Sequence, residues 1–353
     1  MRLMSNNLIR LGIILVLTGF PHIAKSESVV PIKEDQYKTF YRIAHSPIMR
    51  LSKWRAWKKV VPEITKISIT STADGTNQPA LFYSSNSPHK RPLLLVLHSW
   101  SADYKQHYSI PYGIWAVNND WIFMHPNYRG AYTNPQSTAS EVAIEDILDA
   151  LEYAKKHANV DDSRIYITGF SGGAMTTLIM ISRYPDIWAG AAAWVPVYNL
   201  VQWYQTTKNS RHNYSKHIAN SCSGPPLPGT AAEAECHKRS VSTYLKNIRG
   251  KNIPVYIATG IRDGFVSPGH SLQAFNDLAE KNDRISSKDI NYINTYQKLP
   301  PHFSGIYSDT FYSDVGLPLL YEKKSSNVTL KIFNGKHDII YNASLFWLSQ
   351  QTK

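Results

Sequence analysis

The chain has 353 residues, 43% of them hydrophobic, and a formal net charge of +12. This length fits one large α/β domain or two small ones, and the basic excess favours acidic partners such as polyanionic glycans or anionic membrane surfaces. No segment is apolar over enough residues to span a bilayer comfortably, which argues against stable membrane insertion.

The N-terminus has the organisation of a secretory signal peptide. Arg2 and Arg10 precede the apolar run 11–20, and Ala24-Lys25-Ser26 places small residues at the −3 and −1 positions of a cleavage site. We therefore expect residues 1–26 to be removed and the mature protein to be secreted or periplasmic, with an uncleaved N-terminal anchor as the alternative. Nucleic acid is a poor fit as a partner of such an exported protein.

The next segment, 27–63, is a predicted N-terminal extension that is helical in part. Its densest basic run, KWRAWKK at 53–59, puts Trp54, Trp57 and Val61 on one helical face. This pattern favours a helix that packs its aromatic side chains on the domain over a binding patch.

Residues 64–353 alternate strands and helices in one predicted domain. The predicted strands are 64–71, 78–83, 92–97, 121–125, 165–168, 190–195, 254–259 and 328–333, and the main predicted helices are 140–156, 174–181, 271–280 and 342–349. The central runs are continuously apolar, which indicates a mostly parallel α/β sheet with helices on both faces and reactive groups at the carboxyl ends of strands. Two segments leave this alternation: we predict a cap or lid at 197–250 and an insertion at 285–324.

The segment from Arg164 to Tyr184 carries the clearest chemical signal. Its residues 169–173, Gly-Phe-Ser-Gly-Gly, match G-x-S-x-G between a predicted strand and a predicted helix, as in a nucleophile elbow. The glycines let the strand turn directly into the helix, so that the Ser171 hydroxyl projects above the sheet and the Gly172 N–H can bind an oxyanion. The alternative is a glycine-rich turn with an incidental serine.

A serine nucleophile needs a base, and the base needs an orienting carboxylate. Asp263 follows the penultimate predicted strand in GIRDGFV, and His337 follows the last one in FNGKHD. The order Ser171, Asp263, His337 is the order of an α/β-hydrolase triad. We predict these three as nucleophile, orienting acid and base, with Asp338 and Asp314 as fallback carboxylates. Such a triad needs no metal or organic cofactor, and we expect none.

A second oxyanion donor is expected where the strand 92–97 ends, and the backbone N–H of Trp100 is the first choice. The motifs in chain order are LH at 97–98, PNYRG at 126–130, GFSGG at 169–173, GIRDGFV at 260–266 and GKH at 335–337. Together they resemble the catalytic domain of the prolyl oligopeptidase family and secreted esterases built on it, over residues 64–350. The resemblance implies an α/β-hydrolase fold and an acyl-enzyme mechanism. It also implies that the side chain of His98 is an alternative oxyanion donor, because family members place one at that position, commonly a tyrosine.

The chain departs from the family at two points. Ser99 replaces the usual glycine of the oxyanion loop, and the segment between Glu27 and Thr65 leaves no room for the β-propeller that peptidases of this family usually carry. No carboxylate pair for gripping a peptide amino terminus is evident. We therefore expect a carboxylic ester as substrate, either a small molecule or an acyl group on a glycan, with a peptidase as the alternative. An acyltransferase and a binding protein on an inactive scaffold are further alternatives.

Aromatic side chains near these loops are the predicted substrate contacts. Trp194 and Tyr198 follow the strand after the elbow and form an expected platform with Trp203, Tyr204 and Trp100, although such side chains serve equally as core. Tyr128, in PNYRG, is a further predicted substrate contact.

Only two cysteines occur, Cys222 and Cys236, in one segment rich in glycine and proline. In an oxidising compartment a local disulfide is favoured over two free thiols. We predict that this disulfide pins the cap.

Overall fold

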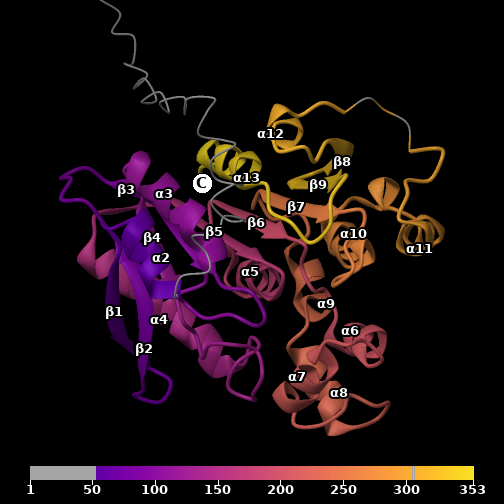
Figure 1. Ribbon diagram of the computed structural model, residues 1–353, viewed down its shortest axis with the longest axis horizontal. Coiled ribbons are helices and arrows are strands. Elements are labelled where there is room, and N and C mark those ends of the chain that lie inside the picture. The colour runs from indigo at the N-terminus through magenta and orange to yellow at the C-terminus, as the bar shows by residue number, and fades with distance from the viewer. Residues whose placement is uncertain (1–52, 304, 306) are drawn as a thin grey trace, which may run out of the picture. The chain divides into compact units, whose positions relative to one another are not determined.

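The computed structural model describes residues 53–353 except 304 and 306 (Figure 1). The predicted signal peptide and most of the predicted extension lie outside the described residues. In the part of the chain that is described, no helix has the length and apolar character needed to cross a membrane.

A nine-stranded sheet forms the centre of the domain, in the order β1-β2-β4-β3-β5-β6-β7-β9-β8. The strands are β1 (Thr65–Thr70), β2 (Asn77–Tyr83), β3 (Arg91–Leu97), β4 (Ile122–Pro126), β5 (Val160–Phe170), β6 (Gly190–Trp194), β7 (Val255–Gly260), β8 (Leu319–Ser325) and β9 (Val328–Phe333). The six strands from β4 to β9 in this order run parallel, while β1, β2 and β8 pair antiparallel at the two edges (Figure 1). The predicted α/β-hydrolase fold is confirmed.

The central strands are apolar because helices cover both faces of the sheet. Every residue of β3 is buried. Leu93 and Leu95 belong to one buried cluster, whereas Leu94 and Val96 belong to the other. Successive side chains of a strand point to opposite faces, so the two clusters are the two halves of the core.

The helices follow the predicted alternation. They are α2 (Lys53–Val60), α3 (Ile110–Asn118), α4 (Glu141–His157), α5 (Gly172–Arg183), α6 (Leu200–Thr207), α7 (Tyr214–Ser221), α8 (Ala231–Lys238), α9 (Val241–Tyr244), α10 (Pro268–Leu278), α11 (Ser287–Tyr296), α12 (Thr310–Ser313) and α13 (Tyr341–Ser349). The Ser140 side chain caps α4 by accepting a hydrogen bond from the Ala143 N–H. On α2, Trp57 is fully buried, which confirms a helix packed on the domain.

Two parts of the architecture were not predicted. Helix α3 connects β3 to β4, and Gly113 within it packs against Trp57 and Ile64 so closely that no larger side chain fits. Strand β8 overlaps the end of the predicted insertion 285–324, which also contains α11 and α12. The predicted cap consists of α6 to α9, with α6, α7 and α8 gathered into one group (Figure 1).

Candidate active site

Ser171 lies at a sharp turn between β5 and α5. Its backbone has φ 57° and ψ −116°, in a region that non-glycine residues rarely adopt and that a nucleophile elbow requires. The turn closes because its glycines allow very close backbone approaches: a Cβ atom added to Gly169 would lie 2.3 Å from the backbone of Gly173. The Ser171 N–H donates to the carbonyl oxygen of Trp194 at 2.9 Å, which fixes the turn to β6.

Asp263 and His337, from the loops after β7 and β9, are hydrogen-bonded to each other. The distance from His337 Nδ1 to Asp263 Oδ2 is 2.6 Å, and the Asp263 side chain is fully buried. Asp263 Oδ1 accepts from the N–H groups of Phe265 and Val266 at 2.8 and 3.0 Å. Because an ionised carboxylate can only accept, the proton is assigned to His337 Nδ1, which leaves Nε2 as a base.

Ser171 and His337 line the same cavity, which has a volume of about 250 Å³. The cavity wall is largely aromatic and includes Trp100, Tyr108, Phe170, Tyr214, Phe265 and Tyr341. The His337 ring lies between Phe170 and Phe265, with ring centroids 4.6 and 5.3 Å away. The predicted nucleophile, base and acid are therefore brought to one place, and the base is held by both a carboxylate and aromatic packing.

Gly172 lies against the backbone of Trp100, which lines this cavity. A Cβ atom on Gly172 would lie 2.9 Å from the Trp100 nitrogen. The neighbouring Ser99 N–H donates to Gln106 Oε1 at 2.8 Å, and the Trp100 carbonyl accepts from Tyr132 N–H at 2.8 Å. Among the described residues no acceptor bonds the Trp100 N–H, so this group and the Gly172 N–H at the start of α5 are available for an oxyanion.

Comparison with known proteins identifies the family. The sequence profile of the prolyl oligopeptidase family matches residues 114–292, half of the chain. The chain belongs to the prolyl oligopeptidase family. The matched span contains Ser171 and Asp263, and His337 lies beyond it.

Curated relatives fall into esterases, a depolymerase and peptidases. Poly(3-hydroxyalkanoate) depolymerase C of Paucimonas lemoignei is 26% identical over 36% of this chain and 33% of its own length. Acylamino-acid-releasing enzyme 1 of Oryza sativa is 26% identical over 62% of this chain and 30% of its own. Acetylxylan esterase of Coprinopsis cinerea is 28% identical over 38% of this chain and 40% of its own. The chain thus matches 30% to 40% of the length of these relatives.

Solved structures of acylaminoacyl peptidases share the fold. One, in complex with Z-Gly-Gly-Phe-chloromethyl ketone, has a TM-score of 0.53 at 14% identity and covers 82% of this chain and 42% of that chain. An uncomplexed Pyrococcus horikoshii acylaminoacyl peptidase has a TM-score of 0.50 at 14% identity, covering 78% and 37%.

His98, which the resemblance suggested as an alternative side-chain oxyanion donor, is not among the residues that line the cavity. It is fully buried, and its Nε2 and Nδ1 lie 2.8 and 3.1 Å from the carbonyl oxygens of Asn127 and Ser99. Its ring stacks on Tyr128 at a centroid distance of 4.1 Å. The expectation that the His98 side chain donates to an oxyanion is therefore corrected, because both of its ring nitrogens face backbone carbonyl oxygens in the core.

The three predicted substrate contacts also lie outside the cavity lining. Trp194 is fully buried and its indole N–H donates to Ser344 Oγ at 3.0 Å. Tyr128 is fully buried, and its hydroxyl donates to the His98 carbonyl at 2.8 Å. The Tyr198 hydroxyl donates to Asp277 Oδ2 at 2.8 Å. This corrects the expected platform: these residues follow the right strands, but their side chains point into the core or toward other helices.

The remaining predicted residues are placed as follows. Asp338 lines the cavity and its Oδ2 accepts from the Lys336 N–H at 3.1 Å, whereas Asp314 lies at the end of α12, outside the cavity lining. Cys222 and Cys236 form the predicted disulfide, which ties the end of α7 to α8. The sequence reasoning missed Tyr108 and Gln106 in the loop after β3, where no local pattern indicates which side chain turns toward Ser171.

Proposed function

We propose that the protein is an exported serine hydrolase that cleaves a carboxylic ester through an acyl-enzyme, with an acyl group on a carbohydrate as the favoured substrate. One observation supports this proposal most strongly. His337 is hydrogen-bonded to Asp263 at 2.6 Å and lines the same cavity as Ser171, which lies at a strained turn.

In the proposed reaction Ser171 Oγ attacks the acyl carbon while His337 Nε2 takes the hydroxyl proton. The negative charge that develops on the acyl oxygen is stabilised by the N–H groups of Gly172 and Trp100. His337 then gives the proton to the leaving alcohol oxygen, the C–O bond breaks, and Ser171 carries the acyl group. Water then attacks the acyl carbon while His337 Nε2 takes its proton. His337 returns that proton to Ser171 Oγ as the bond between Oγ and the acyl carbon breaks, which releases the carboxylic acid and restores Ser171. Asp263 stabilises the imidazolium in both steps.

Three features support an ester over a peptide bond. Acetylxylan esterase and the polyhydroxyalkanoate depolymerase are named for ester substrates. The cavity of about 250 Å³ suits a compact acyl group and leaving group. Its aromatic wall presents ring faces on which sugars can stack. The second candidate, a serine peptidase, is favoured by the match to an acylamino-acid-releasing enzyme, which spans 62% of the chain.

The test compares kcat/KM of the mature protein on an aryl acetate, an acetylated xylo-oligosaccharide and an alanyl anilide, with Ser171→Ala as the blank. We expect Ser171-dependent turnover of both esters and little of the anilide. Dominant anilide cleavage would replace the esterase by the peptidase. Export is tested separately: the N-terminal sequence of the protein recovered outside the cytoplasm should begin at Glu27, and an intact Met1 in that fraction would contradict cleavage.

A further inference from the structure

The cap contains a long stretch without acidic residues. Between Asp186 and Glu233 the chain has no aspartate or glutamate, yet it carries Lys208, Arg211 and Lys216. All three side chains are exposed. We call residues 208–217, which comprise the connection after α6 and the first residues of α7, the cationic edge.

The three cations of the cationic edge are not neutralised within the described part of the chain. None of them pairs with a carboxylate there, and Lys208 Nζ has only a 3.4 Å contact with Gln205 Oε1. By contrast, the Arg239 guanidinium on α8 lies 2.7 Å from Glu235. The cationic edge therefore carries three exposed positive charges without a carboxylate partner among the described residues.

The cationic edge borders the mouth of the active-site cavity. The His212 ring lies 5.1 Å from the ring of Phe265 and 5.5 Å from that of Tyr214, and both of these residues line the cavity. Phe265 is 41% exposed and Tyr108 is 36% exposed, although both are large apolar side chains. Exposed aromatic side chains at a cavity mark a binding surface, and Arg211 directly precedes His212 in the chain.

We propose that the cationic edge binds acidic groups on the part of the substrate beyond the scissile ester, so that the substrate class is an ester of an acidic carbohydrate bearing carboxylate or sulfate groups. This inference rests on the proposed function. The cations attract the acidic groups, while Phe265 and Tyr108 offer flat faces to the sugar rings.

The test uses a triple variant, Lys208→Gln, Arg211→Gln and Lys216→Gln. The matched control changes three exposed lysines, Lys90→Gln, Lys156→Gln and Lys251→Gln. These precede β3, β5 and β7 in the chain and so lie toward the amino ends of the parallel strands, away from the cavity. Circular dichroism and thermal unfolding verify that both variants fold.

The substrates are an acetylated oligouronate and an acetylated neutral xylo-oligosaccharide. We expect the edge variant to lose about tenfold in kcat/KM on the acidic ester, little on the neutral one, and the control variant to lose neither. The wild-type preference for the acidic ester should also vanish between about 0.01 M and 1 M ionic strength, where the screening length falls from about 30 Å to 3 Å. Equal losses on both esters, or none on either, would overturn the inference.

A binding measurement separates this inference from the proposed function. Unacetylated oligouronate is titrated into Ser171→Ala and into the same protein with the three edge substitutions. We expect binding that weakens with salt and is lost on the three edge substitutions. This result would support binding of an acidic carbohydrate at the cationic edge even if no ester is turned over. Binding of anionic vesicles or polyglutamate, but not oligouronate, through the same three cations would overturn the carbohydrate class.

Discussion

At the scale of single residues, the predicted acid is already oriented without substrate. Asp263 accepts two backbone N–H groups on Oδ1 and faces His337 Nδ1 with Oδ2, so that its buried side chain has one arrangement. The same contacts hold the His337 ring with Nε2 free to act as a base.

Asp263→Asn tests this role, because an amide keeps the shape but presents a donor or a weaker acceptor to His337. We expect kcat to fall by about 10³ to 10⁴, with KM changed much less. The control is Asp314→Asn, a carboxylate outside the cavity lining, which should leave kcat unchanged. If Asp314→Asn were as damaging as Asp263→Asn, the assignment of the acid would be wrong.

His270 is a second residue that the fold controls, here by lowering its pKa. Its Nδ1 accepts the Tyr198 N–H at 3.1 Å, and burial lowers its pKa from 6.5 to about 4, against the opposing effect of the Asp263 charge. The unfolded chain therefore binds a proton below about pH 6.5 that the folded chain refuses until about pH 4. The stabilisation is present above pH 6.5 and is lost as the pH falls.

His270→Asn should reduce this loss, since an amide oxygen can still accept the Tyr198 N–H but does not titrate. We expect the free energy of unfolding of the wild type to fall more between pH 7 and pH 4.5 than that of the variant, as measured by urea denaturation at each pH. Parallel pH profiles for the two proteins would show that His270 carries none of the acid sensitivity.

At the scale of elements, the cap contacts both the loop that carries Asp263 and the loop that carries Trp100. Trp203 on α6 donates its indole N–H to the Phe265 carbonyl at 2.9 Å, in the loop that carries Asp263. Its ring also packs edge-on against Trp100, with centroids 4.7 Å apart. One buried side chain of the cap thus contacts the acid loop and the oxyanion loop together.

Trp203→Phe keeps an aromatic ring but removes the donor to Phe265. We expect kcat to fall about fivefold with KM changed less than twofold, because one hydrogen bond to the backbone contributes about 1 kcal/mol. Tyr204→Phe on the same helix is the control and should leave both constants unchanged. An unchanged kcat in Trp203→Phe would mean that the loops hold their geometry without the cap.

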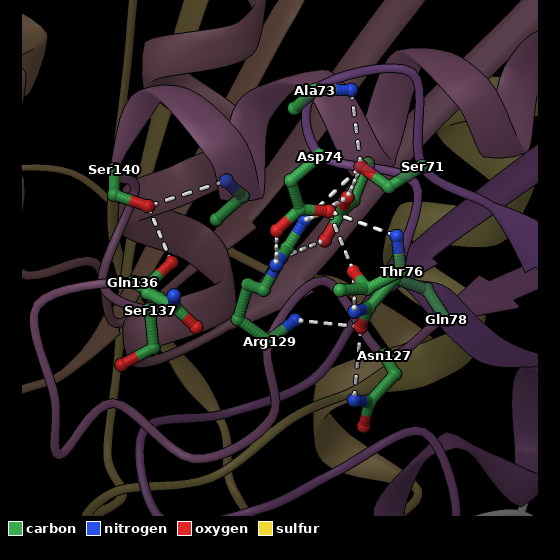
Figure 2. Close-up of polar contacts among 12 residues, drawn as sticks. Ser71, Ala73, Asp74, Thr76, Gln78, Asn127, Arg129, Gln136, Ser137 and Ser140 are labelled. Atoms are coloured by element: carbon green, nitrogen blue, oxygen red, sulfur yellow. Dashed lines mark hydrogen bonds and ion pairs between the residues drawn. The ribbon is translucent and has the colours of Figure 1, made fainter.

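At the scale of the whole molecule, a partly buried ion network ties the antiparallel edge of the sheet to α4. Figure 2 shows Arg129 at its centre. Arg129 Nε lies 2.6 Å from Asp146 Oδ2 and Nη1 lies 2.6 Å from Asp74 Oδ2, while the Ser71 hydroxyl donates to Asp146 at 2.6 Å. The Asp146 side chain is fully buried, and Arg129 and Ser71 satisfy its two carboxylate oxygens.

Arg129→Met should destabilise the fold by about 3 to 5 kcal/mol, because it leaves the Asp146 carboxylate buried and uncompensated. Adding Asp146→Leu should recover much of this loss, since no buried charge then remains. Urea denaturation of the two single variants and the double variant measures the coupling. Additive losses would show that the two side chains do not depend on each other.

The sequence predicted the central sheet and the turn that carries Ser171, because the central strands are apolar throughout and the elbow motif is contiguous in the chain. Strand β8 was missed because it is a half-buried edge strand with charged residues facing water. The cavity lining was missed for a different reason. Tyr108 and Phe265 line the cavity together with Ser171 although they lie far apart in the chain, and no period in the sequence shows where such side chains turn. Trp194, by contrast, ends β6 but is fully buried in the core.

The central claim is that Ser171 becomes acylated. The protein is mixed with an aryl acetate, quenched within one turnover, digested and mapped by mass spectrometry, with Ser171→Ala treated in the same way. We predict one acetyl group on the peptide that contains Ser171 and none on the variant. Turnover with no acetyl group on that peptide, or acetylation that persists in Ser171→Ala, would contradict the account.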